Sequence, residues 1–390
     1  MLKYSSVLQN IPEYPFARVN KFSKTVEERD GIPVINARIG IPDIEAPQVI
    51  KEYLAKYVAA KNSTYGYPCD VHPARGITEL VAAIIEDYRL KYDVKLKPEN
   101  IAVTGWTKIA LHSLVRLFSQ GKILVPDPVY PAYESATLLA FNQIERVKTS
   151  AASGWLPEFK FSKDSVALYF CDPNNPTGAV ASPDYYQALF KEMKTYNVAG
   201  IFDKAYKDYV FDNQTKPVSI TQIPGLMDYG FEVVSLSKHY NFVGIGLGWL
   251  VSSPENIDQW LKLSGHFSQG VDWYTQKTGV EALTNPATKI EMNAYMLELK
   301  ERRDLLVKGL NELGMKVEVP AATPYLWIQV PGGYDDEDFV LNQMISRAHV
   351  AFMPGSYFGQ NGKGYFRATL FLAKDKIAEA LERIKKVRSW

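Results

Sequence analysis

The sequence has few of the residues and patterns that mark a metalloprotein, a disulfide-rich fold or a membrane protein. Cysteine occurs only twice in 390 residues, at Cys69 and Cys171, which excludes a disulfide framework and a thiolate zinc site. The five histidines lie far apart and show no metal-ligand spacing, so we expect no metal site. The longest apolar stretch, residues 242–251, contains three glycines and is far shorter than the roughly 20 residues of a membrane span.

The chain also lacks an excess of charge of either sign. Its 44 basic and 43 acidic side chains leave a formal charge of +1, which gives no electrostatic reason to expect a nucleic acid or an anionic membrane as partner. Residues 1–20 mix polar residues with prolines and lack the continuous apolar core of a signal peptide. We therefore expect a cytoplasmic protein that binds neither nucleic acid nor membrane.

The middle of the chain alternates regularly between short apolar runs and helical patterns. Runs that are apolar on both faces are typical of buried parallel strands, and the amphipathic segments between them predict helices that cover the sheet. The pattern therefore predicts the α/β fold class. The expected strands are residues 101–104, 123–125, 165–171, 198–202, 232–236 and 246–251, and the expected helices include 106–119 and 184–196.

A different pattern begins near residue 289. Residues 289–313 predict one long charged amphipathic helix, with Gly314 as its stop signal. The sequence thus predicts a large α/β domain over residues 46–288 and a smaller α+β domain formed by residues 1–45 and 289–390. The expected elements after the long helix are strands at 315–319, 325–330 and 365–370 and a helix at 377–387.

Ligands of an open α/β sheet bind at the carboxyl ends of its strands, so the residues there are the first to consider. After the first strand, residues 104–108 (Thr-Gly-Trp-Thr-Lys) open a helix whose backbone N–H groups favour an anion such as phosphate. Ordinary helices also begin in this way. After the second strand, Tyr130 could stack on a flat ring, or could belong to a rigid proline-rich turn.

The next three strand ends point more specifically to a heteroaromatic ring. The third ends in Asn-Asn-Pro-Thr-Gly at residues 174–178, which turn chemistry alone explains. The fourth ends in Asp203, with Tyr206 three residues later; this pair can place an acid on a ring nitrogen and a hydroxyl on a ring oxygen. The fifth precedes Lys238, whose amine would be a nucleophile of lowered pKa if it lies away from water. A single lysine is most often a solvated charge, but five such strand ends in succession are hard to assign to chance.

Taken in order, these motifs resemble the aspartate aminotransferase superfamily, the fold type I enzymes that use pyridoxal phosphate (PLP). The resemblance rests on Asn-Asn-Pro-Thr-Gly at 174–178, Asp-x-Ala-Tyr at 203–206 and Ser-x-Ser-Lys at 235–238, and it extends over nearly the whole chain. Within the superfamily, Pro-Asp-Pro-x-Tyr-Pro at 126–131 and Gly-x-Gly-Tyr-x-Arg at 362–367 look most like LL-diaminopimelate aminotransferases and related class I/II enzymes. The resemblance implies a mainly parallel seven-stranded sheet in the large domain.

The resemblance also implies a role for each residue around the cofactor ring. Lys238 would form the Schiff base with PLP and, once released, act as the general base at the substrate Cα. Asp203 would pair with the pyridine nitrogen and keep it protonated, so that the ring can act as an electron sink. Tyr206 and Asn175 would donate hydrogen bonds to the phenolic oxygen of the ring, and Tyr130 would stack on its face.

Two further groups of residues would bind anions. The hydroxyl of Ser235 and the backbone N–H groups of Trp106 and Thr107 would hold the phosphate. Arg367 would bind the substrate α-carboxylate with both arms of its guanidinium, and Gly40 would let the backbone approach that carboxylate.

Homodimer formation is a further expectation from the resemblance, because sites of this type are built between two subunits. Tyr65 and the turn at residues 268–270 would reach into the site of the partner subunit. Tyr325 and residues 14–16 could lie near the distal part of the substrate, or could be core aromatics. The substrate-binding set is therefore expected to be Gly40, Tyr65, Asn175 and Arg367.

One position departs from the family pattern. An arginine eight residues after the Schiff-base lysine normally binds the phosphate, but this chain has Gly246 there. The missing charge-assisted hydrogen bond is worth about 1.5–3 kcal/mol, so weaker retention of PLP is expected. Lys108 could replace part of this contact, or could be a solvated charge on the helix surface.

The expected activity is transfer of an amino group between an α-amino acid and a 2-oxo acid. Two alternatives keep the fold. The protein could be a PLP-dependent C–S lyase or another enzyme of Cα chemistry, because these reactions share their first steps. It could also be a catalytically impaired binding or regulatory protein, for which Gly246 is the only support.

Overall fold

A computed structural model describes residues 2–11, 13–60, 75–212, 214–242, 244–268, 270–388 and 390. The predicted contributions of Tyr65 and Gln269 lie outside these ranges. In the part of the chain that is described, no helix is long and apolar enough to cross a membrane.

Within the described ranges, seven strands form the large sheet in the order β2-β8-β7-β6-β5-β3-β4. Strand β8 runs antiparallel to both of its neighbours and the remaining pairs are parallel, which confirms the predicted mainly parallel α/β fold. The carboxyl ends of the other six strands therefore lie along one edge of the sheet. The strands are β2 (Ile101–Thr104), β3 (Lys122–Asp127), β4 (Gln143–Lys148), β5 (Ser165–Cys171), β6 (Ala199–Asp203), β7 (Gly230–Ser235) and β8 (Gly248–Val251).

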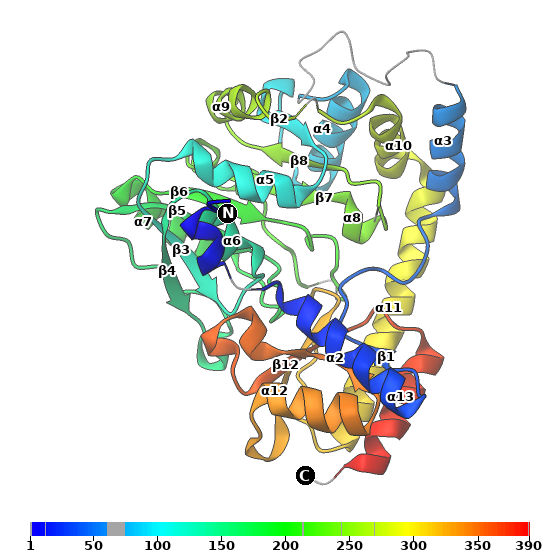
Figure 1. Cartoon of the computed structure of the whole chain (residues 1–390). Helices are drawn as coiled ribbons and strands as arrows, with labels where there is room; N and C mark the ends of the chain where they lie inside the picture. The colour runs from blue at the N-terminus through cyan, green and yellow to red at the C-terminus, as the bar shows by residue number, and fades with distance from the viewer. Residues whose placement is uncertain are drawn as a thin grey trace.

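Helices cover both faces of this sheet (Figure 1). Successive residues of β3 illustrate why, since Ile123 and Val125 pack into one apolar cluster and Leu124 into another. The first cluster also receives α5 and α6, whereas the second receives α7. The helices of this part are α3 (Gln48–Ala59), α4 (Thr78–Tyr92), α5 (Thr107–Leu114), α6 (Ala132–Leu139), α7 (Pro183–Tyr196), α8 (Leu236–His239), α9 (Pro254–Ser264) and α10 (Trp273–Thr284).

Strand β4 is absent from the sequence prediction because it is an edge strand. It pairs only with β3, and Arg146 and Lys148 are exposed on it. A strand with one free edge and charged side chains does not show the continuous apolar run that reveals a buried parallel strand.

Both ends of the chain form the second part, shown below the large sheet in Figure 1. In the ranges that the structure covers, its antiparallel sheet has the order β11-β12-β9, and β1 pairs with β10 in parallel. The long helix α11 runs beside both parts. The division at residues 46–288 stays a prediction. The elements are α1 (Ser6–Asn10), α2 (Pro15–Asp30), β1 (Ile35–Asn36), α11 (Pro286–Glu312), β9 (Tyr325–Gln329), α12 (Asp336–Asp338), a π-helix (Phe339–Arg347), β10 (Val350–Ala351), β11 (Met353–Pro354), β12 (Tyr365–Thr369) and α13 (Lys374–Val387).

The strand predicted at residues 315–319 is wrong. The segment forms a single bridge, between Val317 and Ile328, and no ladder. The side chain of Asn311 accepts a hydrogen bond from the Val317 N–H and donates one to the Val317 carbonyl. These backbone groups are therefore satisfied without a neighbouring strand.

Candidate active site

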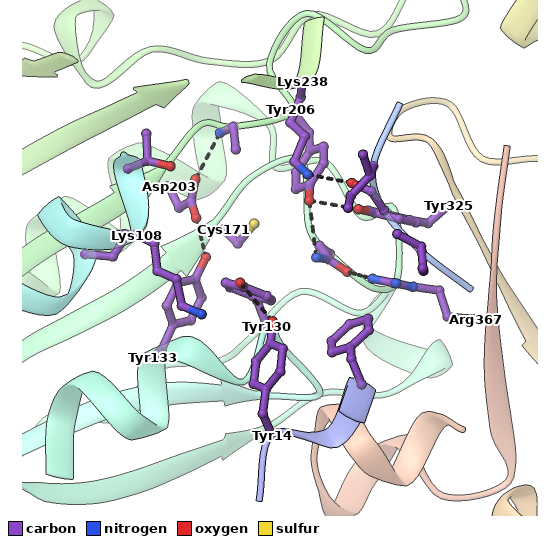
Figure 2. Close-up of a pocket in the computed structure, with 18 of the residues that line it drawn as sticks. Tyr14, Lys108, Tyr130, Tyr133, Cys171, Asp203, Tyr206, Lys238, Tyr325 and Arg367 are labelled. Atoms are coloured by element: carbon purple, nitrogen blue, oxygen red, sulfur yellow. Dashed lines mark hydrogen bonds between the residues drawn. The ribbon is translucent and has the colours of Figure 1, made fainter. Parts of the chain in front are cut away.

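A cavity of about 360 Å³ lies where the carboxyl ends of β5, β6 and β7 meet α2, β9 and β12 of the second part. This volume is within the range of small-molecule sites. Figure 2 shows the side chains that line it. The sequence-predicted residues that line the cavity are Gly40, Thr107, Lys108, Tyr130, Asn175, Asp203, Tyr206, Lys238 and Arg367.

Lys238 brings a buried amine into this cavity. It stands on the short helix α8 directly after β7, and its Nζ donates a hydrogen bond of 2.5 Å to the carbonyl of Gly40. Burial, assisted by repulsion from Arg367 and opposed by Asp203, lowers the pKa of Lys238 from 10.5 to about 8. A substantial fraction of the amine is therefore neutral near pH 8 and able to act as a nucleophile or base.

Asp203, the last residue of β6, is held rigidly beside the same cavity. Its Oδ2 accepts a hydrogen bond of 2.7 Å from the hydroxyl of Tyr133, and its Oδ1 accepts one of 2.9 Å from the Ala205 N–H. Burial raises the pKa of this carboxyl, while the Tyr133 hydroxyl, the Ala205 N–H and the nearby lysines act in the opposite direction. A cationic group at the cavity side of Asp203 would stabilise the carboxylate.

Tyr133 is a site residue that sequence analysis missed. It lies on α6 in the turn after Tyr130, and its ring stacks on Tyr169 with centroids 4.7 Å apart. The proline-rich segment before it drew attention to Tyr130 alone. A second tyrosine three residues after Tyr130 was the available signal, and the two rings meet edge to face with centroids 6.0 Å apart.

A chain of hydrogen bonds connects Tyr206 with Arg367. The Asn175 side chain donates from Nδ2 to the Tyr206 hydroxyl over 3.3 Å and accepts at Oδ1 from Nη1 of Arg367 over 2.8 Å. The hydroxyls of Tyr206 and Tyr325 are 3.0 Å apart. Burial raises the pKa of Tyr206 well above its usual value, so the phenol keeps its proton and can donate it in a hydrogen bond.

Arg367 is a buried cation whose partners are neutral. It is 1% exposed on β12, its Nη2 donates to the Arg38 carbonyl over 2.7 Å, and its Nε has no partner among the described residues. Its guanidinium carbon lies 4.1 Å from the ring centroid of Tyr325 and 4.7 Å from that of Phe358. In the described part of the chain no carboxylate pairs with it, so a carboxylate entering the cavity would remove the cost of this buried charge.

Gly40 has a steric role in this structure, and its contact with a substrate stays a prediction. A Cβ at this position would overlap the hydroxyl of Tyr325 and lie 3.0 Å from its Cζ. With Gly40 packed against Tyr325, the Gly40 carbonyl accepts the hydrogen bond from Lys238, and the Tyr325 ring lies against the guanidinium of Arg367.

These features agree with the comparisons with known proteins. Residues 33–384 match the family described as aminotransferase class I and II. The chain belongs to this family. It is 33% identical to LL-diaminopimelate aminotransferase of Moorella thermoacetica. The alignment spans 389 residues and covers 97% of each of the two chains.

Solved structures of other proteins have the same fold. The substrate-bound structure of BacF from Bacillus subtilis covers 100% of this chain and 98% of its own, with 28% identity and a TM-score of 0.90. A single mutant of Thermus thermophilus aspartate aminotransferase, with a TM-score of 0.90 and 24% identity, covers 99% of this chain and 100% of its own. This aminotransferase therefore has the fold type I architecture, uses PLP and transfers amino groups.

The lining of the cavity of this aminotransferase suits PLP in charge and in chemistry. Three basic side chains, Lys108, Lys238 and Arg367, and the single carboxylate of Asp203 line the described walls, so the cavity suits anionic ligands. The amine of Lys238, which would react with the aldehyde of PLP, and the carboxylate of Asp203, which would pair with the ring nitrogen, both line the cavity. Thr107, the first residue of α5, lies at the end where backbone N–H groups favour a phosphate.

Two of the predicted phosphate residues, Ser235 and Trp106, are not among the described residues that line this cavity. The Ser235 hydroxyl is buried and accepts a hydrogen bond from the Ser237 N–H over 3.1 Å. Trp106 lines a separate, smaller hollow of about 240 Å³ with Gly246. Lys108 faces the cavity with its Nζ 4.7 Å from the ring centroid of Tyr14. The phosphate roles of these residues stay predictions.

The aromatic residues that sequence analysis left open lie in the cavity wall. Tyr14, Phe16 and Tyr325 all line it, and the hydroxyl of Tyr14 is 3.4 Å from that of Tyr130. Tyr14 thus lies across the cavity from Lys238 (Figure 2).

The lowered pKa of Lys238 predicts how the cofactor-free enzyme captures PLP. The capture rate should rise with pH up to about 8 and then level off, because the neutral amine is the nucleophile and its cation is not. Stopped-flow absorbance with a fixed PLP concentration measures this profile. A rate that still climbs about tenfold per pH unit between pH 9 and 10 would indicate an ordinary, solvated lysine instead.

Proposed function

We propose that the 360 Å³ cavity is the active site, in which Lys238 binds PLP covalently and Arg367 binds the α-carboxylate of the amino acid or 2-oxo acid. One observation carries this proposal: a buried amine of lowered pKa and a buried guanidinium with neutral partners open into the same cavity. Asp203 is assigned to the ring nitrogen, and Tyr206 with Asn175 to the phenolic oxygen.

Each residue of the site then has a separate role in transamination. When bound, PLP supplies a ring that withdraws electrons from the substrate Cα. The neutral amine of Lys238 would take the proton from the substrate Cα and deliver it to the aldehyde carbon of the cofactor, for which a pKa near the working pH is favourable. Arg367 fixes the carboxylate, and so the direction of the Cα–H bond, while the buried walls keep water away. Asp203 stays ionised opposite the protonated ring nitrogen.

The amino donor is the part of the function on which the relatives give guidance. Relatives of about one-third identity bear the name LL-diaminopimelate aminotransferase, so we propose LL-diaminopimelate as the first donor to test. The donor would place its α-carboxylate on Arg367 and its side chain toward Tyr14 and Phe16. Of the described lining residues, Lys108 is the further cation that a second carboxylate could meet there.

We also propose that the enzyme acts as a homodimer in the cytoplasm. Support for a partner surface comes from apolar side chains close to the proposed phosphate end. Trp106, Ile109 and Phe267 are each more than 40% exposed and line the same hollow of about 240 Å³. A surface of this kind is a candidate for burial against a second copy of the chain.

A donor panel followed as half-reactions tests the activity. The PLP-loaded enzyme is mixed with single amino acids, including LL-diaminopimelate, aspartate, glutamate and phenylalanine, without a 2-oxo acid. We expect one class of donor to yield a stoichiometric amount of its 2-oxo acid and the pyridoxamine form of the cofactor, with no free ammonia. Release of ammonia and pyruvate in many turnovers would show an elimination enzyme, and no reaction with any donor would contradict the proposal.

A further inference from the structure

Trp106 and Gly246 lie close together just outside an antiparallel pair of strands. The ladder of β2 and β8 ends with Thr104 opposite Gly248, and Trp106 and Gly246 each lie two residues away from that pair. A Cβ on Gly246 would overlap Cε2 of the Trp106 indole and lie 2.7 Å from its Cδ2 and Nε1. Gly246 also has a φ of +70°, which side chains rarely adopt. Position 246 therefore admits only glycine while the indole lies over it.

Helix capping does not explain the tryptophan at this position. Trp106 is the N-cap residue of α5, and its side chain makes no capping hydrogen bond. Serine, threonine, aspartate or asparagine would stabilise the helix there by about 1 kcal/mol. The large ring is thus present at some cost to the helix, at the end of α5 that points toward the phosphate.

The surroundings of the pair contain no basic residue that could take the place of an arginine. The described residues that line the hollow around Trp106 and Gly246 include no lysine or arginine. Lys108 is two residues further along α5, on the opposite side of the helix, and its amine lies over the ring of Tyr14. The indole of Trp106 therefore occupies the space that a side chain at position 246 would fill.

We propose that Trp106 and Gly246 are a matched pair beside the N-terminus of α5, in which an indole occupies the space that an arginine side chain at position 246 would need to reach a phosphate there. The inference rests on the proposed function, because it assumes that PLP occupies the cavity beside α5. The phosphate is then held by backbone N–H groups and hydroxyls, which are weaker partners than an arginine. With the indole in its present position, an arginine side chain at position 246 would overlap it.

Binding of PLP and of pyridoxal, which lacks the phosphate, to cofactor-free proteins tests this pair. The ratio of the two dissociation constants isolates the contribution of the phosphate. The proteins are the wild type, Gly246→Arg, Trp106→Ser, Trp106→Ser/Gly246→Arg and, as a steric control without charge, Trp106→Ser/Gly246→Ala. Circular dichroism and thermal melting of each protein without cofactor report on the fold.

We expect Gly246→Arg alone to leave the ratio unchanged or to destabilise the fold, because the indole blocks the new side chain. In the double variant with arginine, the preference for PLP over pyridoxal should exceed that of the alanine control by on the order of 10- to 100-fold, the value of one charge-assisted hydrogen bond. The preference of this variant should also decrease with salt more steeply than that of the control.

Two results would overturn the inference. One is tighter PLP binding by a folded Gly246→Arg protein that still has Trp106, since the indole would then not exclude the arginine. The other is an equal preference for PLP in the arginine and alanine double variants. Borohydride fixation of PLP on Lys238 in the wild type separates these results from a failure of the proposed function, in which Lys238 would not be labelled.

Discussion

Lys238→Ala should lower the rate of transamination by at least about 10⁴-fold, the largest loss that we expect from a single substitution. The variant loses the covalent attachment of PLP and the base that moves the proton at Cα, and a positioned base alone contributes about 10²–10⁴-fold. The measurement is single-turnover conversion of the donor identified by the panel, at a PLP concentration that saturates the variant. PLP should still bind, because Asp203 and the N-terminus of α5 are unchanged.

Two controls separate this loss from a structural defect. Lys277→Ala removes a lysine that is paired with Glu79 on the surface of α10, outside the cavity, and should leave the rate near that of the wild type. Small primary amines in solution should restore part of the activity of Lys238→Ala by entering the space left by the side chain. Full activity of Lys238→Ala without added amine would contradict the assigned mechanism.

Replacement of Arg367 by alanine should have the second largest effect, and it should act on recognition of the α-carboxylate. A bidentate contact contains two charge-assisted hydrogen bonds of about 1.5–3 kcal/mol each, so kcat/KM for the amino acid should decrease by about 10²–10³-fold or more. The amine that results from decarboxylation of the same amino acid lacks the α-carboxylate. Its slow transamination should therefore have nearly the same kcat/KM in Arg367→Ala as in the wild type. The ratio of the two kcat/KM values therefore measures the carboxylate contact directly.

Arg367→Lys and a second buried arginine provide the matched controls. Lysine keeps the charge but cannot form the bidentate contact, so an intermediate loss is expected. Arg302 is also buried, but it lies on α11 and pairs with Asp43 and Glu298. Arg302→Lys should leave the ratio between amino acid and amine unchanged. An unchanged ratio in Arg367→Ala would show that the carboxylate binds elsewhere.

The sequence predicted the strands that carry the site because their apolar runs are continuous. Strands β5, β6 and β7 are buried on both faces, and the polar residue that follows each run stands out. Asp203 and Lys238 stand out in this way, Asn175 was assigned through the family resemblance, and all three lie in one cavity. The edge strand β4 could not be found by the same signal, because its charges break the apolar run.

Residues that depend on the meeting of distant segments were harder to predict. Tyr133 donates to Asp203 across 70 positions of sequence, and no local pattern encodes that pairing. Tyr14 and Phe16 reach the cavity because α2 packs against the π-helix of the same part. The role of Gly246 likewise became clear only from the fold, in which the indole of Trp106 lies over position 246.

Reduction of the PLP-loaded wild type with borohydride, followed by digestion and mass spectrometry, tests the central claim most directly. The account predicts that the reduced cofactor is bound to the peptide that contains Lys238, in a stoichiometry of about one per chain. Modification of a different lysine would contradict it, above all of Lys108 in the same cavity or of Lys204, which is buried next to Asp203 and paired with Asp172.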